Sequence, residues 1–389
     1  MKKIALPNGL CVSEVALGAM NFGTTTSVKE AYEVLDIYMD MGGNFIDTSN
    51  NYAHWAGTGD ESETVLGQWL KDSKRRNDVI LATKVGFDRH GEGAGLKKEQ
   101  IEFWIDESLR KLGTDHIDLD YCREKGIQVH NAEGCNAGGV MQYVFSALYG
   151  VAARKAIKLD DMTMGIVGVG HVGSLVEKMA RYLGFKVLLC DPPRAEAEGP
   201  DGFCSLDYLL TNSQIVTMHV PLDDTTRRMA NEDFFAMMPT GSIFINASRG
   251  EVVDEEALIQ DMPKFGAVVI DTWNGEPDIN EELMDMVDIA TPHIAGYSYQ
   301  GKLNGTSASV QAVARHLGIE PLYDFYPQDG DEDRSPVLLD LKGKTQGQIA
   351  AVFQYNYPIF TDDFRFRMEP DNFEKMRSNY QYRREIYVE

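Results

Sequence analysis

The sequence has few cysteines, a deficit of basic residues and no long hydrophobic run. Its five cysteines are scattered and odd in number, with no Cys-x-x-Cys spacing, which argues against a disulfide framework or a zinc site and predicts free thiols and no metal. Lys and Arg number 37 against 60 Asp and Glu, a net charge of −23. Such a charge disfavours nucleic acid and anionic membranes as partners, because both attract basic patches. An anionic substrate would therefore need a local cationic pocket.

The chain also lacks the roughly 18 consecutive apolar residues of a membrane span, and its start, MKKIALPNGL, lacks the apolar core of a signal peptide. We therefore expect a cytoplasmic protein. A length of 389 residues with 43% hydrophobic and 25% charged residues is typical of a globular protein with two or three domains.

Hydrophobic periodicity divides the chain into blocks, and it predicts an α/β protein. Residues 1–112 alternate strand-like and amphipathic helical runs, as in half of a β/α barrel. Residues 134–309 contain a long helical run near 136–156 and then short apolar strands, which predicts a doubly wound parallel sheet. Residues 310–389 contain an acidic stretch and an aromatic tail that ends in a basic, helical FEKMRSNYQYRREIYVE, interpreted as a small α+β domain. The strands expected in the middle block, besides those of the unit described next, are IVTMHV, SIFINAS, AVVIDTW and DIATPHI.

The most informative segment is GIVGVGHVG, residues 165–173, followed by the strand KVLLC, which ends at Asp191. A strand, a Gly-x-Gly-x-x-Gly turn, a helix and an acid 21 residues after Gly170 form a dinucleotide-binding unit. The helix N-terminus faces the phosphates, and the acid accepts hydrogen bonds from a ribose diol and repels a 2′-phosphate, so NAD is favoured over NADP. The residues of this unit expected to bind the cofactor are Gly168, Gly170, His171, Val172, Gly173 and Asp191.

Three polar residues follow later strands, where a doubly wound sheet presents its ligands. Arg249 in NASRG suits bidentate binding of a carboxylate. Glu276 lies in IDTWNGEP, and His293 lies in DIATPHIAGYS. A histidine that transfers a proton, a carboxylate that orients it and an arginine that fixes a 2-hydroxy acid form one mechanism. Together they predict a catalytic site.

These stretches, with GCNAGGVMQYVFSAL, HVPL, INASRGEVVDEEAL and DIATPHIAGYSYQGKLNGT, give residues 113–389 a specific resemblance to the D-isomer-specific 2-hydroxyacid dehydrogenases. LLCDPPR, PHIAGYSYQGK and the RSNYQYRRE-like tail favour the branch that oxidises 4-phospho-D-erythronate at C2 with NAD in pyridoxine 5′-phosphate synthesis. The resemblance implies a small phosphorylated 2-hydroxy acid as substrate, His293 as proton donor and acceptor, and a C-terminal homodimerisation domain at 310–389. It also implies catalytic roles for Arg249 and Glu276, substrate contact by Tyr297, and a cofactor site that includes Val220, Ala247, Ser248, Asp271 and Gly296.

Residues 1–112 instead resemble the start of an aldo-keto reductase. The stretches LPNGLCVSEVALGAMNFG, FIDTSNNYAHWAGTGDESETVLGQWL and ILATKVG contain that family's Asp47, Tyr52 and Lys84. In this arrangement a lysine held by an aspartate tunes a tyrosine proton donor. The family's histidine should follow HIDLDY, but Cys122 and Arg123 stand there.

The join between the two resemblances lies in GTDHIDLDY, which fits a barrel strand in one family and a turn and helix in the other. Because CREKGIQVHNAEGCN continues the dehydrogenase pattern, we expect a helix from about Leu119 to Gly126 and a remnant of a substrate-binding lobe at 113–133. Pro263 should end its helix early and could displace Glu276 relative to His293. Three functions remain open: an active dehydrogenase, a catalytically silent NAD-binding dimer whose substrate lobe is replaced, and an aldo-keto reductase.

Overall fold

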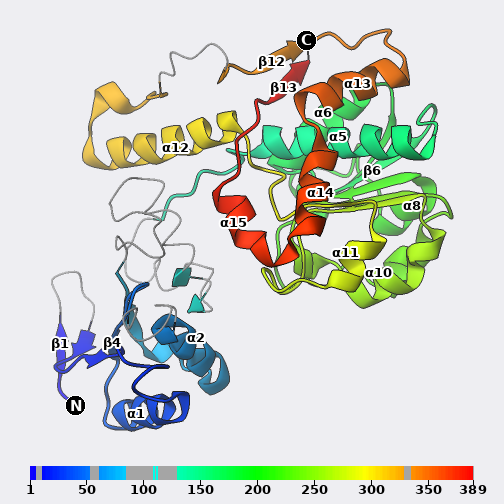
Figure 1. Cartoon of the computed structure of the whole chain (residues 1–389). Coiled ribbons are helices and arrows are strands. Elements are labelled where there is room, and N and C mark those ends of the chain that lie inside the picture. The colour runs from blue at the N-terminus through cyan, green and yellow to red at the C-terminus, as the bar shows by residue number, and fades with distance from the viewer. Residues whose placement is uncertain are drawn as a thin grey trace. The chain divides into compact units, whose positions relative to one another are not determined.

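The chain folds into two compact units, Met1–Val129 and His130–Glu389. The structure is a computed structural model, shown in Figure 1. The residues that the structure describes are 1–5, 11–52, 61–84, 108–109, 111–112, 129–327 and 334–388.

The first unit is built around a three-stranded parallel sheet of order β3-β4-β5, with helices between successive strands. This arrangement confirms the β/α alternation expected for the described part of 1–112. The helix expected from about Leu119 to Gly126 lies outside the described residues. The elements are β1 (Lys3–Ala5), β2 (Cys11–Ser13), β3 (Leu17–Gly18), α1 (Val28–Asp40), β4 (Phe45–Asp47), α2 (Glu61–Ser73), a 3-10 turn (Arg76–Asp78) and β5 (Ile80–Ala82).

Local sequence explains why α1 begins where it does. Ser27 caps the helix by accepting from the Glu30 N–H, and the Glu30 side chain accepts from the Ser27 N–H, which satisfies two backbone donors at the helix start. Leu35 on α1 and Leu66 and Trp69 on α2 are buried with Ile46 of β4. These contacts form a small core between the helices and the sheet.

The second unit contains a six-stranded sheet in which every pair of neighbours is parallel. Its order is β11-β10-β9-β8-β6-β7, so the chain leaves β6 in one direction for β7 and returns on the other side for β8. Ligands bind outside the carboxyl ends of the strands at such a switch point. The strands are β6 (Thr163–Val167), β7 (Lys186–Cys190), β8 (Ile215–Met218), β9 (Ile243–Asn246), β10 (Ala267–Ile270) and β11 (Ile289–Ala290).

Helices cover both faces of this sheet, so its strands are apolar on both sides. In β9, for example, Ile243 and Ile245 join the core formed with α5, whereas Phe244 joins the core on the opposite face. The sheet is thereby fixed in register along every strand. The covering helices are α5 (Ala137–Lys155), α6 (His171–Tyr182), α7 (Pro192–Glu198), α8 (Leu206–Asn212), α9 (Glu232–Met237), α10 (Glu255–Asp261) and α11 (Glu281–Met286), with 3-10 turns at Gly250–Val252 and Met262–Lys264.

The sequence-based elements of this block are confirmed. The expected long helix is α5, capped at Asn136 and Ala156, and the strand, helix and strand of the glycine unit are β6, α6 and β7. Pro263 ends α10 at Asp261, as expected, because its ring prevents a further helical turn.

The C-terminal segment packs onto the same unit (Figure 1). Phe353 of α13 stacks on Tyr149 of α5, with ring centroids 5.6 Å apart. The elements are α12 (Tyr299–Leu317), a 3-10 turn (Glu320–Leu322), β12 (Val337–Leu339), α13 (Gln346–Asn356), α14 (Ile359–Met368), a 3-10 turn (Pro370–Asn372), α15 (Phe373–Ser378) and β13 (Ile386–Val388).

The expectation of a helix throughout the basic tail is wrong after Ser378. The helix α15 ends there, and the chain continues in an extended form to β13, which pairs in parallel with β12. This pairing joins residues about 50 positions apart in the sequence, so local helical periodicity could not reveal it. Among the described residues, every helix is too short or too polar to cross a membrane.

Candidate active site

The glycine turn has the shape that a dinucleotide requires. Gly168 has a φ of +85°, and a Cβ there would lie 2.6 Å from the His219 carbonyl oxygen. A Cβ on Gly173 would lie 2.1 Å from the Gly168 carbonyl oxygen, so helix and turn meet at backbone contact. At Gly170, by contrast, a Cβ would meet no atom within 4 Å. The turn is therefore closely packed at Gly168 and Gly173 and open at Gly170, the residue that precedes α6.

Asp191 lies at the end of β7 and connects this turn to the next helix. Its Oδ2 accepts a hydrogen bond from the Val169 N–H at 2.7 Å, and its Oδ1 caps α7 by accepting from the Arg194 N–H at 3.0 Å. A carboxylate oxygen can accept more than one hydrogen bond, so these contacts fix Asp191 and leave acceptor capacity for a ribose diol. Arg194 itself is held by Glu198, with two contacts of 2.7 Å.

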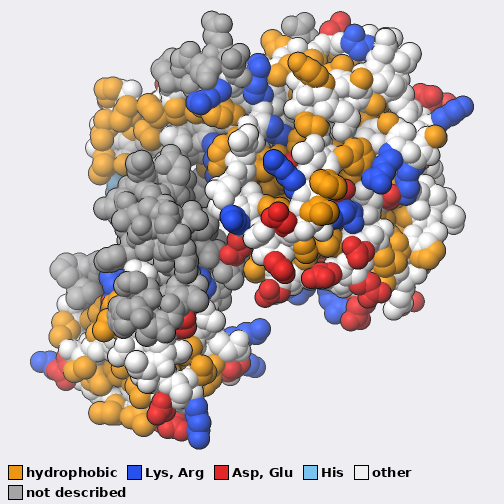
Figure 2. Space-filling model, viewed as in Figure 1, with side chains coloured by type: hydrophobic (Ala, Val, Ile, Leu, Met, Phe, Trp, Pro, Cys, Tyr) orange, Lys and Arg blue, Asp and Glu red, His pale blue; other side chains and the backbone are white. Residues whose placement is uncertain are grey.

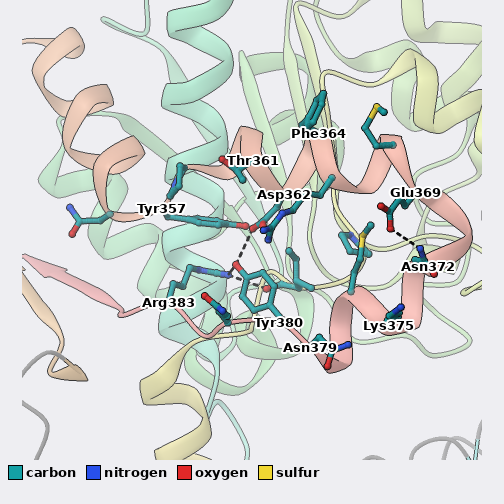
Figure 3. Close-up of a pocket in the computed structure, with 18 residues that line it drawn as sticks. Tyr357, Thr361, Asp362, Phe364, Glu369, Asn372, Lys375, Asn379, Tyr380 and Arg383 are labelled. Carbon is teal, nitrogen blue, oxygen red and sulfur yellow. Dashed lines mark hydrogen bonds between the residues drawn. The ribbon is translucent and has the colours of Figure 1, made fainter. Parts of the chain in front are cut away.

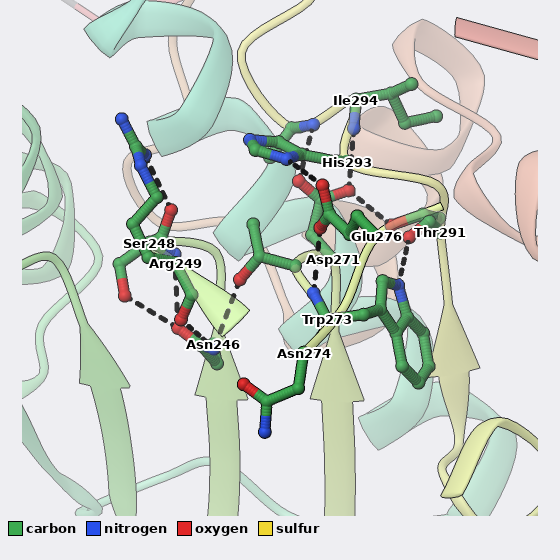
Figure 4. A network of polar contacts seen from close by, with 12 residues as sticks. Asn246, Ser248, Arg249, Asp271, Trp273, Asn274, Glu276, Thr291, His293 and Ile294 are labelled. Carbon is green, nitrogen blue, oxygen red and sulfur yellow. Dashed lines mark hydrogen bonds and ion pairs between the residues drawn. The ribbon is translucent and has the colours of Figure 1, made fainter. Parts of the chain in front are cut away.

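Glu276 and His293 form a hydrogen-bonded pair across two neighbouring strands. His293 Nδ1 lies 2.8 Å from Glu276 Oε2, and Glu276 Oε1 accepts from the Trp273 N–H at 2.8 Å. Both carboxylate oxygens are thereby fixed, and Nδ1 is oriented toward the carboxylate (Figure 4). The early end of α10 at Pro263 leaves this pair intact.

The pKa of Glu276 reflects this pairing. Burial acts to raise the pKa of the carboxyl group, but the hydrogen bond and charge of His293 lower it. The Trp273 N–H and the charge of Arg377 act in the same direction, and the net result is a lowered pKa. Glu276 is therefore a carboxylate at neutral pH and favours a proton on the facing imidazole nitrogen.

Asp271 organises the loop that carries His293. Its Oδ1 accepts from the Ile294 N–H at 2.9 Å and from the Thr291 hydroxyl at 2.6 Å, and its Oδ2 accepts from the Ala295 N–H at 2.9 Å. Burial raises the pKa of the Asp271 carboxyl, although the charge of His293 and these hydrogen bonds act in the opposite direction. His293 adopts a φ of +54°, uncommon for a residue other than glycine, and this hydrogen-bonded loop maintains it.

Arg249 follows β9, the neighbour of β10, so it lies at the same edge of the sheet as Glu276 and His293 (Figure 4). Its side chain is exposed, and Nη1 donates to the Ser248 carbonyl at 2.7 Å. Asn246 holds the turn, because its Nδ2 donates to the Arg249 carbonyl at 3.0 Å and its Oδ1 accepts from the Ser248 hydroxyl at 2.7 Å. Sequence analysis did not identify this role of Asn246.

The remaining predicted cofactor residues lie on the loops at this edge. His171 is the exposed first residue of α6, and Gly134 approaches its ring so closely that a Cβ there would lie 2.6 Å from its Cγ. Gly296 approaches Asn136 in the same way, because a Cβ on Gly296 would lie 2.3 Å from Asn136 Nδ2. The others are the partly buried Val172 on α6, Val220 after β8, Ala247 after β9 and, fully enclosed, Ser248.

Tyr297 lies four residues after His293 and is surrounded by the C-terminal segment. Its ring centroid lies 5.8 Å from that of Tyr380 and 6.1 Å from that of Tyr382, and Lys302 and Arg377 lie over its faces. Sequence analysis missed Arg377 as a site residue. A basic residue in a tail carries no local signal of a contact with a loop some 80 positions earlier.

A pocket of about 760 Å³ lies between α14, α15 and the segment that follows them (Figure 3). Pro292 and Ile294, which flank His293, belong to its lining, whereas the three predicted catalytic residues do not. Arg383 spans the wall, since it stacks on the Tyr357 ring at 4.0 Å and donates to the Tyr380 hydroxyl at 3.1 Å. The pocket therefore borders the loop that carries His293 but does not include the predicted catalytic side chains.

The first unit brings together the three residues expected from the aldo-keto reductase resemblance. Asp47 Oδ2 accepts from the Tyr52 hydroxyl at 2.6 Å, and Oδ1 accepts from Lys84 Nζ at 2.6 Å. Burial acts to lower the pKa of Lys84, but Asp47 and Tyr52 raise it overall, so Lys84 is an ammonium ion. Cys122 and Arg123, at the position of the missing histidine, lie outside the described residues.

The residues present fit NAD. The open face at Gly170 and the fixed Asp191 suit a pyrophosphate and a ribose, and no group of three or more metal-ligating side chains occurs in the described part of the chain. When bound, NAD supplies the hydride acceptor.

Comparison with known families agrees with this site. The D-isomer specific 2-hydroxyacid dehydrogenase NAD-binding domain matches residues 147–295, and the aldo/keto reductase family matches residues 14–137. The erythronate-4-phosphate dehydrogenase of Bacteroides fragilis is 40% identical over 313 residues, which cover 79% of this chain and 85% of that protein. That of Yersinia pestis is 40% identical over 283 residues, 70% of this chain and 75% of that protein.

Among solved structures, D-lactate dehydrogenase from Aquifex aeolicus, complexed with NAD and lactic acid, aligns with a TM-score of 0.44 at 23% identity, over 73% of this chain and 99% of that one. From the glycine turn, the Glu276–His293 pair and the 40% identical relatives, the chain belongs to the D-isomer-specific 2-hydroxyacid dehydrogenases and is an NAD-dependent oxidoreductase of that family.

Proposed function

We propose that this chain oxidises 4-phospho-D-erythronate at C2 to the 2-oxo acid in pyridoxine 5′-phosphate synthesis. The observation that carries the proposal is the Glu276–His293 pair, 2.8 Å apart at the edge of the sheet where the glycine turn lies. The 40% identical relatives bear the name of this activity. We also propose a cytoplasmic location.

His293 accepts the proton of the C2 hydroxyl group. With Nδ1–H donated to Glu276, the neutral imidazole presents the lone pair of Nε2 to the substrate. As the O–H proton moves to Nε2, the C2–H hydride leaves and the C2–O bond becomes a carbonyl. The Glu276 carboxylate stabilises the imidazolium that forms, because its lowered pKa keeps it ionised.

Arg249 binds the substrate carboxylate in this proposal. Its guanidinium projects from the turn after β9 beside the loops of Glu276 and His293, and a planar fork matches a carboxylate in two parallel hydrogen bonds. Tyr297 contacts the remainder of the substrate. The predicted cofactor residues align NAD with the substrate. Misplacement of the reacting atoms by about 1 Å would lower the rate of the reaction strongly.

We further propose that the first unit stands in place of the usual substrate-binding lobe, and the second candidate that follows from this is a catalytically silent NAD-binding protein. The match of residues 14–137 to the aldo/keto reductase family favours such a replacement. We assign 113–133 to a remnant of the original lobe, 134–309 to the NAD-binding domain and 310–389 to a dimerisation domain.

Homodimerisation is supported by apolar side chains on the surface of that last domain. Val313 and Leu317 on α12 are 57% and 63% exposed, and Figure 2 shows hydrophobic side chains along this helix. Tyr355 on α13 is 88% exposed. Exposed apolar patches often mark interfaces, and Val313 and Leu317 lie one turn apart on one face of α12.

We expect light scattering to give twice the chain mass, and Leu317→Glu to give the monomer mass, whereas Tyr208→Glu, at an exposed side chain of α8, serves as the matched control. A monomeric wild type contradicts the assignment.

Two measurements on the same preparation test the activity. NADH formation is followed with 4-phospho-D-erythronate, and NADH binding is followed by fluorescence. Turnover that depends on the phosphorylated acid supports the proposal, and binding without turnover supports the silent alternative. Reduction of carbonyl compounds with NADPH would instead indicate that Asp47, Tyr52 and Lys84 act as in the aldo-keto reductases.

A further inference from the structure

Two cations and two tyrosines surround the ring of Tyr297, which follows His293 in the same loop. Tyr297 lies between Tyr380 and Tyr382, and Lys302 Nζ lies 5.6 Å from the Tyr297 centroid and 5.3 Å from that of Tyr382. Arg377 Cζ lies 5.9 Å from the Tyr297 centroid. Two basic side chains therefore lie against one aromatic cluster.

Arg377 is held by aromatic faces rather than by a carboxylate. Its guanidinium lies over Tyr297 and, at 5.8 Å, over Phe373, and its Nε is buried without a hydrogen-bond partner. In the described part of the chain no ion pair joins Arg377 to an acidic residue. A buried donor of a charged group without a partner is costly, so the arrangement favours an anion that would accept from it.

Hydrogen bonds join the C-terminal segment that contains Arg377 to the loop that carries His293. Arg383 Nη1 donates to the Ile294 carbonyl at 3.2 Å, Arg383 Nη2 donates to the Ala295 carbonyl, and the Tyr299 N–H donates to the Arg383 carbonyl at 2.8 Å. The charge of Arg377 also contributes to the lowered pKa of Glu276.

We propose that Arg377 and Lys302 form an anion subsite beside Tyr297 that binds the phosphate group of the substrate. The inference rests on the proposed function in one respect, that the substrate is a phosphorylated 2-hydroxy acid. Arg249 binds the carboxylate end and His293 faces C2, so the phosphate end extends toward Tyr297. The C-terminal segment thus binds part of the substrate.

The test measures binding rather than turnover. Full-length chain saturated with NADH, which cannot oxidise the acid, is titrated with 4-phospho-D-erythronate and with D-erythronate in a calorimeter. Wild type binds the phosphorylated acid more tightly. Arg377→Met weakens binding of the phosphorylated acid by about 10- to 100-fold, as expected for one charge-assisted contact, and changes binding of D-erythronate by less than about threefold. Lys375→Met, a basic and exposed neighbour on α15, is the matched control and leaves both affinities unchanged.

Several outcomes overturn the subsite: a wild type without preference for the phosphorylated acid, an unchanged affinity in Arg377→Met, or an equal loss for both compounds. If Arg377→Met does not fold, Lys302→Met tests the same selective loss. Arg377→Lys, which keeps the charge, should retain more affinity than Arg377→Met. Wild type that prefers the phosphorylated acid but never forms NADH from it contradicts the proposed function and supports the subsite.

Discussion

At the scale of single residues, the proposed proton transfer depends on the orientation of one imidazole ring, that of His293. Glu276 holds Nδ1 of His293, and Asp271 holds the backbone of the loop on which His293 lies. Glu276 therefore orients the imidazole ring, whereas Asp271 orients the backbone of the loop. The buried Asp271 interacts entirely within the protein in its described contacts, so its effect on the cofactor site acts through the position of residues 293–296.

Replacement of His293 separates catalysis from cofactor binding. We expect His293→Asn to lower kcat by about two to four orders of magnitude, because a general acid/base is lost, and to leave NADH binding intact. NADH formation and NADH fluorescence measure the two effects. His316→Asn, an exposed histidine on α12, is the control and should keep wild-type kcat. Unchanged turnover in His293→Asn would remove His293 from the mechanism.

His219, at the end of β8, makes stability depend on pH. Burial lowers its pKa from 6.5 to about 3, and its Nδ1 is buried without a hydrogen-bond partner. The unfolded chain therefore binds more protons than the folded chain between pH 3 and 6.5, and stability falls as the pH falls through this window. Relative to His219→Gln, wild type should lose about 2 kcal/mol of unfolding free energy between pH 7 and pH 5. Urea unfolding at both pH values measures the difference, and parallel curves would contradict the buried neutral state.

At the scale of elements, two glycines of the glycine turn are expected to have different tasks. Gly173 is needed for the packing of the turn, whereas Gly170 should be needed only for access of the cofactor. Gly173→Ala places a Cβ 2.1 Å from the Gly168 carbonyl oxygen, so the chain should be destabilised and NADH binding lost together. Gly170→Ala meets no atom, so its unfolding free energy should stay within about 0.5 kcal/mol of wild type. Its Cβ would still occupy the open face, and NADH affinity should fall at least about tenfold.

Denaturant unfolding and NADH fluorescence of the two variants check this contrast. Wild-type affinity in Gly170→Ala would mean that the cofactor does not approach the backbone there.

Elements with a strong local pattern could be predicted from the sequence, and those that depend on distant partners could not. Apolar runs between breakers predicted β6 to β11, and Asn136 to Ala156 predicted α5. The end of α15 at Ser378 depends on the pairing of β13 with β12, and the environment of Tyr297 depends on rings from residues 380–382. Arg249, Glu276 and His293 could be proposed together from the sequence because each lies in the loop that follows a strand, whereas Arg377 does not.

At the scale of the whole molecule, the residues proposed for the cofactor and the reaction all belong to the unit His130–Glu389. Its sheet is covered on both faces by helices of the same unit, and the C-terminal segment packs on α5. Such a unit has the core it needs to fold alone. The first unit has a separate core around Ile46 and Trp69.

Residues 130–389 expressed alone should therefore bind NADH within about threefold of the full chain, because all the proposed cofactor residues lie in this unit. A tenfold change in affinity would correspond to about 1.4 kcal/mol of binding free energy. NADH fluorescence titrations of both proteins measure this, and circular dichroism confirms that the shorter chain is folded. A loss of tenfold or more would show that the first unit contributes to the cofactor site. Comparison of NADH formation by the two proteins then identifies the role of the first unit: if turnover falls while binding stays, catalysis requires Met1–Val129, and if both stay, the second unit suffices for catalysis.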